Sequence, residues 1–105
     1  MATAYIREYA NVAASFGNLI QAGAEPAIAD QTVTTSGTSA SANAFNANTR
    51  MIAISTPAAQ AVACKFSATP VAAVTALVTS LRLPAGSIFF FGVRPGDIVA
   101  LIDVT

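Results

Sequence analysis

The chain contains no histidine and no tryptophan, and only one of its 105 residues is a cysteine. The absence of histidine removes the side chain that most often serves as general base, metal ligand or pH switch near neutrality. A single cysteine cannot form an intrachain disulfide, and a zinc site needs several Cys or His ligands. The sequence therefore excludes a zinc-bound or disulfide-stapled domain and fits a protein made and assembled in a reducing cytoplasm.

Charged side chains are also scarce. Five basic and five acidic residues give a formal net charge of zero, and only 10% of the residues are charged. Such a chain has no basic patch for nucleic acid or for an anionic membrane. Hydrophobic residues make up 54% of the sequence, which is much for a chain of this length to bury. We therefore expect a single domain, residues 1–105, with part of its apolar surface facing another subunit.

Neither a signal peptide nor a membrane span is predicted. Arg7 and Glu8 lie where the apolar core of a signal peptide would have to be. The longest uncharged apolar stretch, Phe66–Leu81, contains Pro70 and is shorter than the ~20 residues that a spanning helix needs.

The acidic side chains and glycines form no recognisable catalytic or phosphate-binding motif. The carboxylates are scattered along the chain at Glu8, Glu25, Asp30, Asp97 and Asp103. A glycosidase-type pair of carboxylates would have to be assembled by folding alone. The later glycines lie in turn-like contexts, not between a strand and a helix as in a phosphate-binding loop. We therefore predict no catalytic, metal or cofactor site and no enzymatic activity.

The clearest secondary-structure signal lies between Ser80 and Val104. Three short runs rich in β-branched and aromatic residues are divided by Pro84-Ala85-Gly86 and by Pro95-Gly96. Such runs, separated by compact turn sequences, are typical of antiparallel strands. They predict a C-terminal three-stranded meander that pairs these segments in turn: 80–83 with 87–91, and 88–93 with 98–104.

Further strands are predicted upstream. Arg50–Thr56 and Gln60–Ser67 alternate in side-chain character, with Thr56-Pro57-Ala58-Ala59 as the turn of a hairpin between them. Ala27–Thr35 is a further strand, and the polar run Ser36–Asn48 reads as a long loop flanking a short strand. The fold predicted from this spacing is all-β: a small antiparallel β-sandwich or β-barrel of the jelly-roll-like kind.

Two segments are ambiguous in secondary structure. Ala10–Ala24 has apolar residues near helical spacing, but glycine and asparagine weaken a helix there. Ala68–Thr79 is apolar and contains Pro70, so it fits either a loop lying across the sheet or one helical turn, of which we favour the loop.

Alternation along the strands assigns faces to the cysteine and to the aromatic run. Cys64 shares a face with Val62 and Phe66, which predicts a buried, inert thiol rather than a nucleophile. Phe89 and Phe91 share one face of their strand, and the strand is either buried on both sides or in contact with a neighbouring subunit.

Three arginines lie at strand or turn edges: Arg50, Arg82 and Arg94. In so charge-poor a chain we expect at least one of them to pair across a subunit boundary with Asp97 or Asp103.

The first eleven residues form a candidate arm. Tyr5, Ile6 and Tyr9 are large, and aromatic residues are enriched at interfaces. An extended arm over residues 1–11 could reach a neighbouring subunit and add itself to a sheet edge, or its large side chains could cover the core of their own subunit. The residues expected at an interface are Tyr5, Ile6, Tyr9, Arg50, Phe89, Phe91 and Arg94.

Four segments of the chain resemble a family of small tailed-bacteriophage proteins that are encoded among virion structural genes near the major capsid protein. The segments are Ser41-Ala42-Asn43-Ala44-Phe45, Thr49-Arg50-Met51-Ile52-Ala53-Ile54, Ala63-Cys64-Lys65-Phe66-Ser67, and the run from Leu83 to Asp97 with Phe91-Gly92-Val93-Arg94-Pro95-Gly96 near its end. The resemblance covers roughly residues 30 to 105. It departs at Ser67-Ala68-Thr69-Pro70, where the family tends to have a glycine before the proline.

The resemblance implies a capsid decoration (cement) protein on the virion surface, made in the cytoplasm of the host bacterium. Its implied partners are the major capsid protein and further copies of itself, with a trimer over a local threefold axis as one form. The alternatives are a tail, neck or fibre component, or a small carbohydrate- or ligand-binding β-sandwich. The last would need an exposed Trp or Tyr platform, whereas this chain has no Trp and both tyrosines lie near the N-terminus.

Overall fold

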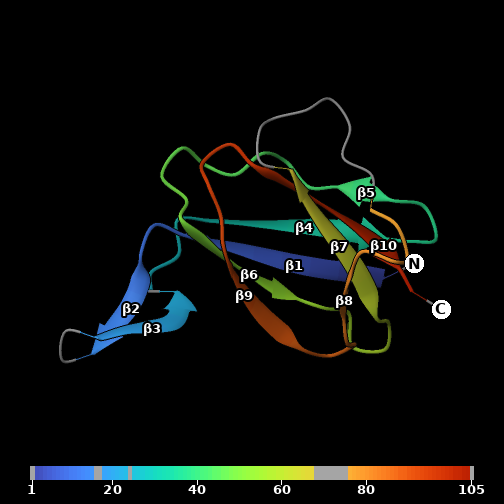
Figure 1. The fold of residues 1–105 in the computed structure, drawn as a ribbon, viewed down its shortest axis with the longest axis horizontal. Helices are drawn as coiled ribbons and strands as arrows, with labels where there is room; N and C mark the ends of the chain where they lie inside the picture. The colour runs from blue at the N-terminus through green and yellow to red at the C-terminus, as the bar shows by residue number, and fades with distance from the viewer. Residues whose placement is uncertain (1, 16–17, 24, 68–75, 105) are drawn as a thin grey trace.

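The computed structural model describes residues 2–15, 18–23, 25–67 and 76–104, with backbone alone at 12–15 and 18–23 (Figure 1). These residues form β-strands and no helix, so this part of the chain contains no helix long and apolar enough to cross a membrane. The strands are β1 (Ala2–Tyr9), β2 (Val12–Ser15), β3 (Asn18–Gly23), β4 (Ala29–Thr35), β5 (Ala40–Ser41), β6 (Met51–Ser55), β7 (Val62–Ser67), β8 (Leu81–Leu83), β9 (Ile88–Gly92) and β10 (Ile98–Asp103).

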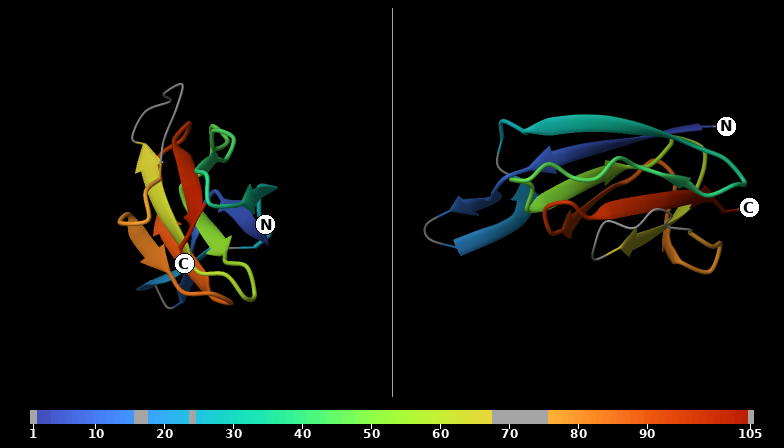
Figure 2. Two further views of the ribbon diagram at one scale, coloured as in Figure 1. Left: turned by 90° about the vertical axis from the view of Figure 1, so that its right-hand side faces the viewer. Right: turned by 90° about the horizontal axis from the view of Figure 1, so that it is seen from above.

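Two antiparallel four-stranded sheets pack face to face, which confirms the predicted all-β sandwich. The first sheet has the strand order β4-β1-β6-β9 and the second has the order β5-β10-β7-β8. The view from above in Figure 2 shows the two layers. The core between them is built by inward-facing residues of both sheets and by Phe45 of the loop before β6; the sheet residues include Ile6, Val33, Ile52, Ile54, Val62, Cys64, Leu83, Val99 and Leu101.

The first strand lies inside the first sheet. β1 pairs with β4 on one side and with β6 on the other, so both of its edges are used within its own chain. Ala4 and Ile6 point into the core and are 0% and 1% exposed. The hypothesis of an N-terminal arm reaching a neighbouring subunit is therefore wrong, because removing this strand would split the first sheet in two.

The ambiguous segment after β1 forms a hairpin instead of a helix. β2 and β3 pair antiparallel as a separate two-stranded sheet that projects from the sandwich (Figure 1). β3 lies close to β6 and β9. The Ser36–Asn48 segment is a loop with the short strand β5, as predicted.

The predicted C-terminal meander is wrong in its pairing, although each of its strands is present. β8 pairs with β7, β9 pairs with β6, and β10 pairs with β7 and β5. β8, β9 and β10 therefore alternate between the two sheets. The predicted β6–β7 hairpin is wrong for the same reason. β9 pairs with β6 over five residues, whereas β8 is only three residues long. Pairing with β6 therefore satisfies more backbone groups of β9 than pairing with β8 would.

Thr56 explains why the two turn sequences carry the chain between sheets. Its hydroxyl donates to the Pro84 carbonyl and accepts from the Ser87 N–H, both at 2.8 Å. The Gly86 N–H donates to the Pro57 carbonyl at 2.8 Å, and Gly86 has φ 67°, a conformation that suits glycine. The turn after β6 and the turn after β8 therefore bind each other, and each turn connects one sheet to the other.

The two sides of the sandwich where the edge strands lie are built differently. At the β4–β5 side, the amide of Gln31 accepts from the Asn43 N–H at 2.9 Å and donates to the Asn43 carbonyl at 3.2 Å. The Asp103 N–H donates to the Ser36 carbonyl at 2.8 Å. These bonds tie the sheets together there, whereas β8 and β9 end the opposite side.

The segment expected to lie across the sheet is mostly outside the described residues, which resume at position 76. Ala76 is fully buried and packs with Ala100, alongside Ile98 and Ile102.

Candidate functional site

The outer face of the first sheet carries the candidate site, and the strand register determines its shape. Arg7 of β1 lies between Asp30 of β4 and Ala53 of β6, and Ala53 lies opposite Phe90 of β9. The next row across the sheet holds, in the same strand order, Thr32, Tyr5, Ser55 and Ile88. The small β6 residues thus lie between large β1 and β9 side chains.

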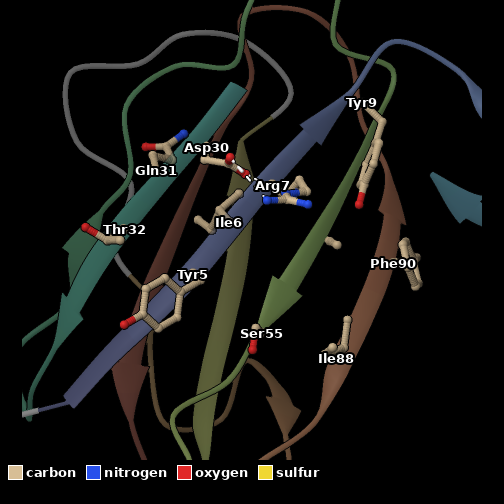
Figure 3. Close-up of a pocket in the computed structure, with 11 residues that line it drawn as sticks. Tyr5, Ile6, Arg7, Tyr9, Asp30, Gln31, Thr32, Ser55, Ile88 and Phe90 are labelled. Carbon is tan, nitrogen blue, oxygen red and sulfur yellow. Dashed lines mark hydrogen bonds and ion pairs between the residues drawn. The ribbon is translucent and has the colours of Figure 1, made fainter. Parts of the chain in front are cut away.

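This arrangement produces a groove of about 680 Å³, which we call the β6 groove (Figure 3). Ala53 and Ser55 form its floor, and Tyr5 and Ile88 form opposite walls. Tyr5 is 58% exposed and Ile88 is 63% exposed, so both apolar walls are open to solvent.

The β1–β4 wall of the groove is polar. The Arg7 Nε donates to Asp30 Oδ1 at 2.8 Å, and Nη2 lies 3.4 Å from Oδ2. Arg7 Nη1 also lies 3.5 Å from Glu25 Oε2. The hydrogen bond to Asp30, with the charges of Asp30 and Glu25, raises the pKa of Arg7 above its ordinary value. The guanidinium is thereby held by two carboxylates beside the aromatic wall.

Tyr9 closes one end of the groove. Its hydroxyl donates to Glu25 Oε2 at 2.8 Å, and its ring lies 6.4 Å from that of Phe90 in a tilted pair. Met51 and Ala53 pack with these rings. Burial and the hydrogen bond to Glu25 raise the pKa of Tyr9. This end is therefore a fixed apolar platform, in contrast to the exposed Tyr5 end.

The groove offers ring faces, a methyl-lined wall and a charged pair, which suit stacking and hydrogen bonding to a neutral polar ligand. Among the described residues, no three His, Cys, Asp or Glu side chains come together in a metal-binding group. Cys64 is buried in the core, 2% exposed, and burial raises the pKa of its thiol to about 11, as predicted for an inert cysteine.

The residues predicted at an interface are separated by the fold. Tyr5 is exposed on the groove, and Tyr9 is buried at its end. The assignment of Ile6, Phe89 and Phe91 to an interface is corrected, because all three face the core of their own sandwich. Phe91 packs there in a tilted ring pair with Phe66, 5.1 Å between centroids.

Arg50 and Arg94 are exposed and lie outside the groove. Arg50 Nη1 donates to the Thr49 carbonyl at 3.3 Å, and the Arg94 N–H donates to the Asp97 carboxylate at 3.2 Å. Their pairing across a subunit boundary stays a prediction.

Sequence reasoning missed most of the groove. Alternation placed Phe89 and Phe91 together on one face of their strand, which leaves Phe90 on the face of the groove. The small residues at 53 and 55 give the groove its depth, and they matter only through the pairing of β6 with β1 and β9.

No protein-family model, curated protein or solved structure matches the chain.

Proposed function

We propose that the protein is a structural virion protein of a tailed bacteriophage, a capsid decoration protein that self-associates and contacts neighbouring subunits of the major capsid protein. The observation that carries the proposal is the series of motifs from Ser41 to Asp97 that resembles small phage proteins encoded near the capsid gene. In the fold these motifs form the framework β6, β7 and β9 and the turns that join the sheets.

The surface suits a protein that works by contact. Apolar side chains are exposed on several elements: Tyr5, Ile28, Leu77, Val78, Leu81 and Ile88. Burial of apolar surface stabilises an assembly by roughly 25 cal/mol per Å². A decoration protein with so few charges would resist genome pressure by such burial and by backbone pairing, with little dependence on salt.

The test compares virions of the phage that encodes this gene with virions from which the gene is deleted. We expect mass spectrometry to detect the protein in intact particles, and electron microscopy to show extra density on the capsid that deletion removes. Adding purified protein to the deleted particles should restore both the density and their resistance to heating. Density at the tail, neck or fibre would instead support the alternative virion role, and absence from particles contradicts both.

A ligand-binding β-sandwich is the second candidate, and the β6 groove favours it. A ligand-binding module of this kind needs an exposed Trp or Tyr platform. Tyr5 supplies one beside Ile88 and the Arg7–Asp30 pair. If the groove binds a neutral oligosaccharide, titration followed by NMR should shift the amides of β1 and β9, and Tyr5→Ala should abolish the shifts. Leu81→Ala, on an equally exposed residue of the other sheet, is the matched control. If no amide of β1 or β9 shifts with any member of a panel of bacterial surface glycans, this candidate function is ruled out.

A further inference from the structure

The two sides of the first sheet end in different ways. β4 ends one side, and there Gln31 pairs with the backbone of Asn43 and Asp30 adds a charge. β9 ends the other side, and no described strand pairs with its outer edge. Its residues Ile88–Gly92 include no charge and no proline. Natural proteins usually protect an open edge with charged residues or proline, because an unprotected edge pairs with another strand.

The direction of the β9 backbone groups follows from its pairing with β6. The Val93 N–H donates to the Arg50 carbonyl at 3.0 Å, and the Thr56 N–H donates to the Ser87 carbonyl at 2.8 Å. Hydrogen-bonded pairs alternate with non-hydrogen-bonded pairs in an antiparallel ladder. Phe89 and Phe91 therefore turn their N–H and C=O groups toward β6. The N–H and C=O groups of Ile88, Phe90 and Gly92 point away from the sheet.

The outer-face side chains of β9 differ in size between the two ends of the strand. Ile88, Phe90 and Gly92 share the outer face, and Ile88 is 63% exposed. Gly92 is also exposed, and a Cβ placed on it would meet no atom within 4 Å. Ile88, two residues before Phe90, therefore offers a large side chain, and Gly92, two residues after Phe90, leaves open space.

We infer that β9 is the pairing edge for the β9 strand of a second copy of this chain, aligned antiparallel with Phe90 opposite Phe90. In this register Ile88 of each copy lies opposite Gly92 of the other copy, so the branched side chain occupies the space above the glycine. The outward N–H and C=O groups of Ile88, Phe90 and Gly92 then all pair, and the two first sheets become one continuous sheet.

This pairing has twofold symmetry, as isologous contacts between identical chains require. The inference rests on the self-association part of the proposed function and names its surface. It gives a dimer as the basic unit rather than a trimer formed by a threefold contact.

Sedimentation velocity and equilibrium at micromolar concentration test the pairing. The wild-type chain is expected at twice the monomer mass. Ile88→Lys and Gly92→Ile should each raise the dimer dissociation constant by roughly tenfold or more, since the first adds charge to the edge and the second fills the space that Ile88 needs. Leu81→Lys, at a 57% exposed edge residue of the second sheet, is the matched control and should stay dimeric.

The exchanged double variant Ile88→Gly with Gly92→Ile makes the test specific. It restores one large residue opposite one glycine across the interface, so it should dimerise more tightly than Gly92→Ile alone. Circular dichroism checks that each variant is folded. Hydrogen exchange should show the amides of Ile88, Phe90 and Gly92 protected at high concentration and exchanging fast on dilution.

Three results would overturn the inference: a wild-type monomer throughout the concentration range, a trimer, or dimerisation unaffected by both single substitutions. Attachment to capsids is measured separately by cosedimentation with particles that lack the protein. A chain that attaches to capsids but fails these tests contradicts the pairing alone, whereas a β9-paired dimer that is absent from virions contradicts the proposed capsid role alone.

Discussion

The Glu8 carboxylate accepts a hydrogen bond from the Thr49 hydroxyl at 2.8 Å, and both side chains are buried. The same carboxylate oxygen accepts the Asn46 N–H at 2.8 Å, and the other oxygen lies 3.4 Å from the Gln31 side-chain nitrogen. Glu8 thus joins β1 to the loop before β6 and to β4. A buried carboxylate persists in a core only when its oxygens are satisfied in this way.

Substitution of Glu8 by Gln is expected to lower the free energy of unfolding by about 1–3 kcal/mol, because an amide brings two donors to a site lined by donors. Thr49→Val, which keeps the shape but removes one donor, should have a similar effect. Urea unfolding measures both. Thr34→Val, at an exposed threonine of β4, is the control and should change stability by less than about 0.5 kcal/mol. A Glu8→Gln variant as stable as wild type contradicts the role given to this carboxylate.

Deletion of residues 2–11 should unfold the protein, because β1 is paired on both sides inside the first sheet. Within the strand, Ile6→Ala should cost about 2–5 kcal/mol, as expected for a fully buried aliphatic side chain. Tyr5→Ala, at the neighbouring exposed position, should cost much less. Circular dichroism and chemical unfolding provide the readout, and a folded truncated chain would show that β1 is dispensable.

Thr56→Val should lower stability by about 1–3 kcal/mol, because it leaves the Ser87 N–H and the Pro84 carbonyl without their partner. Thr56→Ser keeps the hydroxyl and should recover most of that loss. Thermal unfolding of the three proteins in parallel measures the difference. A Val variant as stable as wild type, with the loss confined to the Ser variant, would mean that the methyl group, and not the hydroxyl, holds the turns together.

Stability should fall in alkaline solution through Cys64. Burial raises the pKa of its thiol from 9.0 to about 11, so the folded state holds the proton more tightly than the unfolded state. This contribution is complete below pH 9 and is lost as the pH rises through 11, a change of about 3 kcal/mol. Tyr9, whose pKa is also raised, acts in the same direction.

Comparison with Cys64→Ala isolates the thiol from Tyr9. The alanine variant should be less stable than wild type near neutrality, and the gap should narrow between pH 9 and 11. Urea unfolding at a series of pH values provides the measurement. A gap that stays constant with pH would mean that the thiol titrates equally in both states.

The strands could be predicted because their signal is local. The alternation of Val62, Cys64 and Phe66 places these residues on the core side, where the fold has them, and Ile88–Gly92 was recognised from its β-branched and aromatic residues. The all-β sandwich follows from many such runs at close spacing. Gly86 and Gly96 both have positive φ, as their turn sequences indicate.

The pairing of the strands could not be predicted, because the same turn sequence suits a hairpin and a crossing between sheets. What distinguishes the two at Pro84–Gly86 is a partner distant in sequence, the Thr56 hydroxyl. The β6 groove was missed for a related reason. Tyr5 and Ile88 become opposite walls only when β6 separates β1 from β9, and no local pattern contains that register.

The chain crosses between the sheets at the β6–β7, β8–β9 and β9–β10 connections, which has a consequence for how it folds. Among the described pairs of the two large sheets, the partners nearest in sequence are Cys64 and Leu81, and the others are further apart. None of these described pairs is therefore a short hairpin that could form early and act as a template for the rest. Long loops must close before any ladder contributes stability, and proteins dominated by such distant contacts fold in roughly milliseconds to seconds. During that interval the uncharged β9 segment has no strand beside it, so we expect refolding yields to fall as the protein concentration rises.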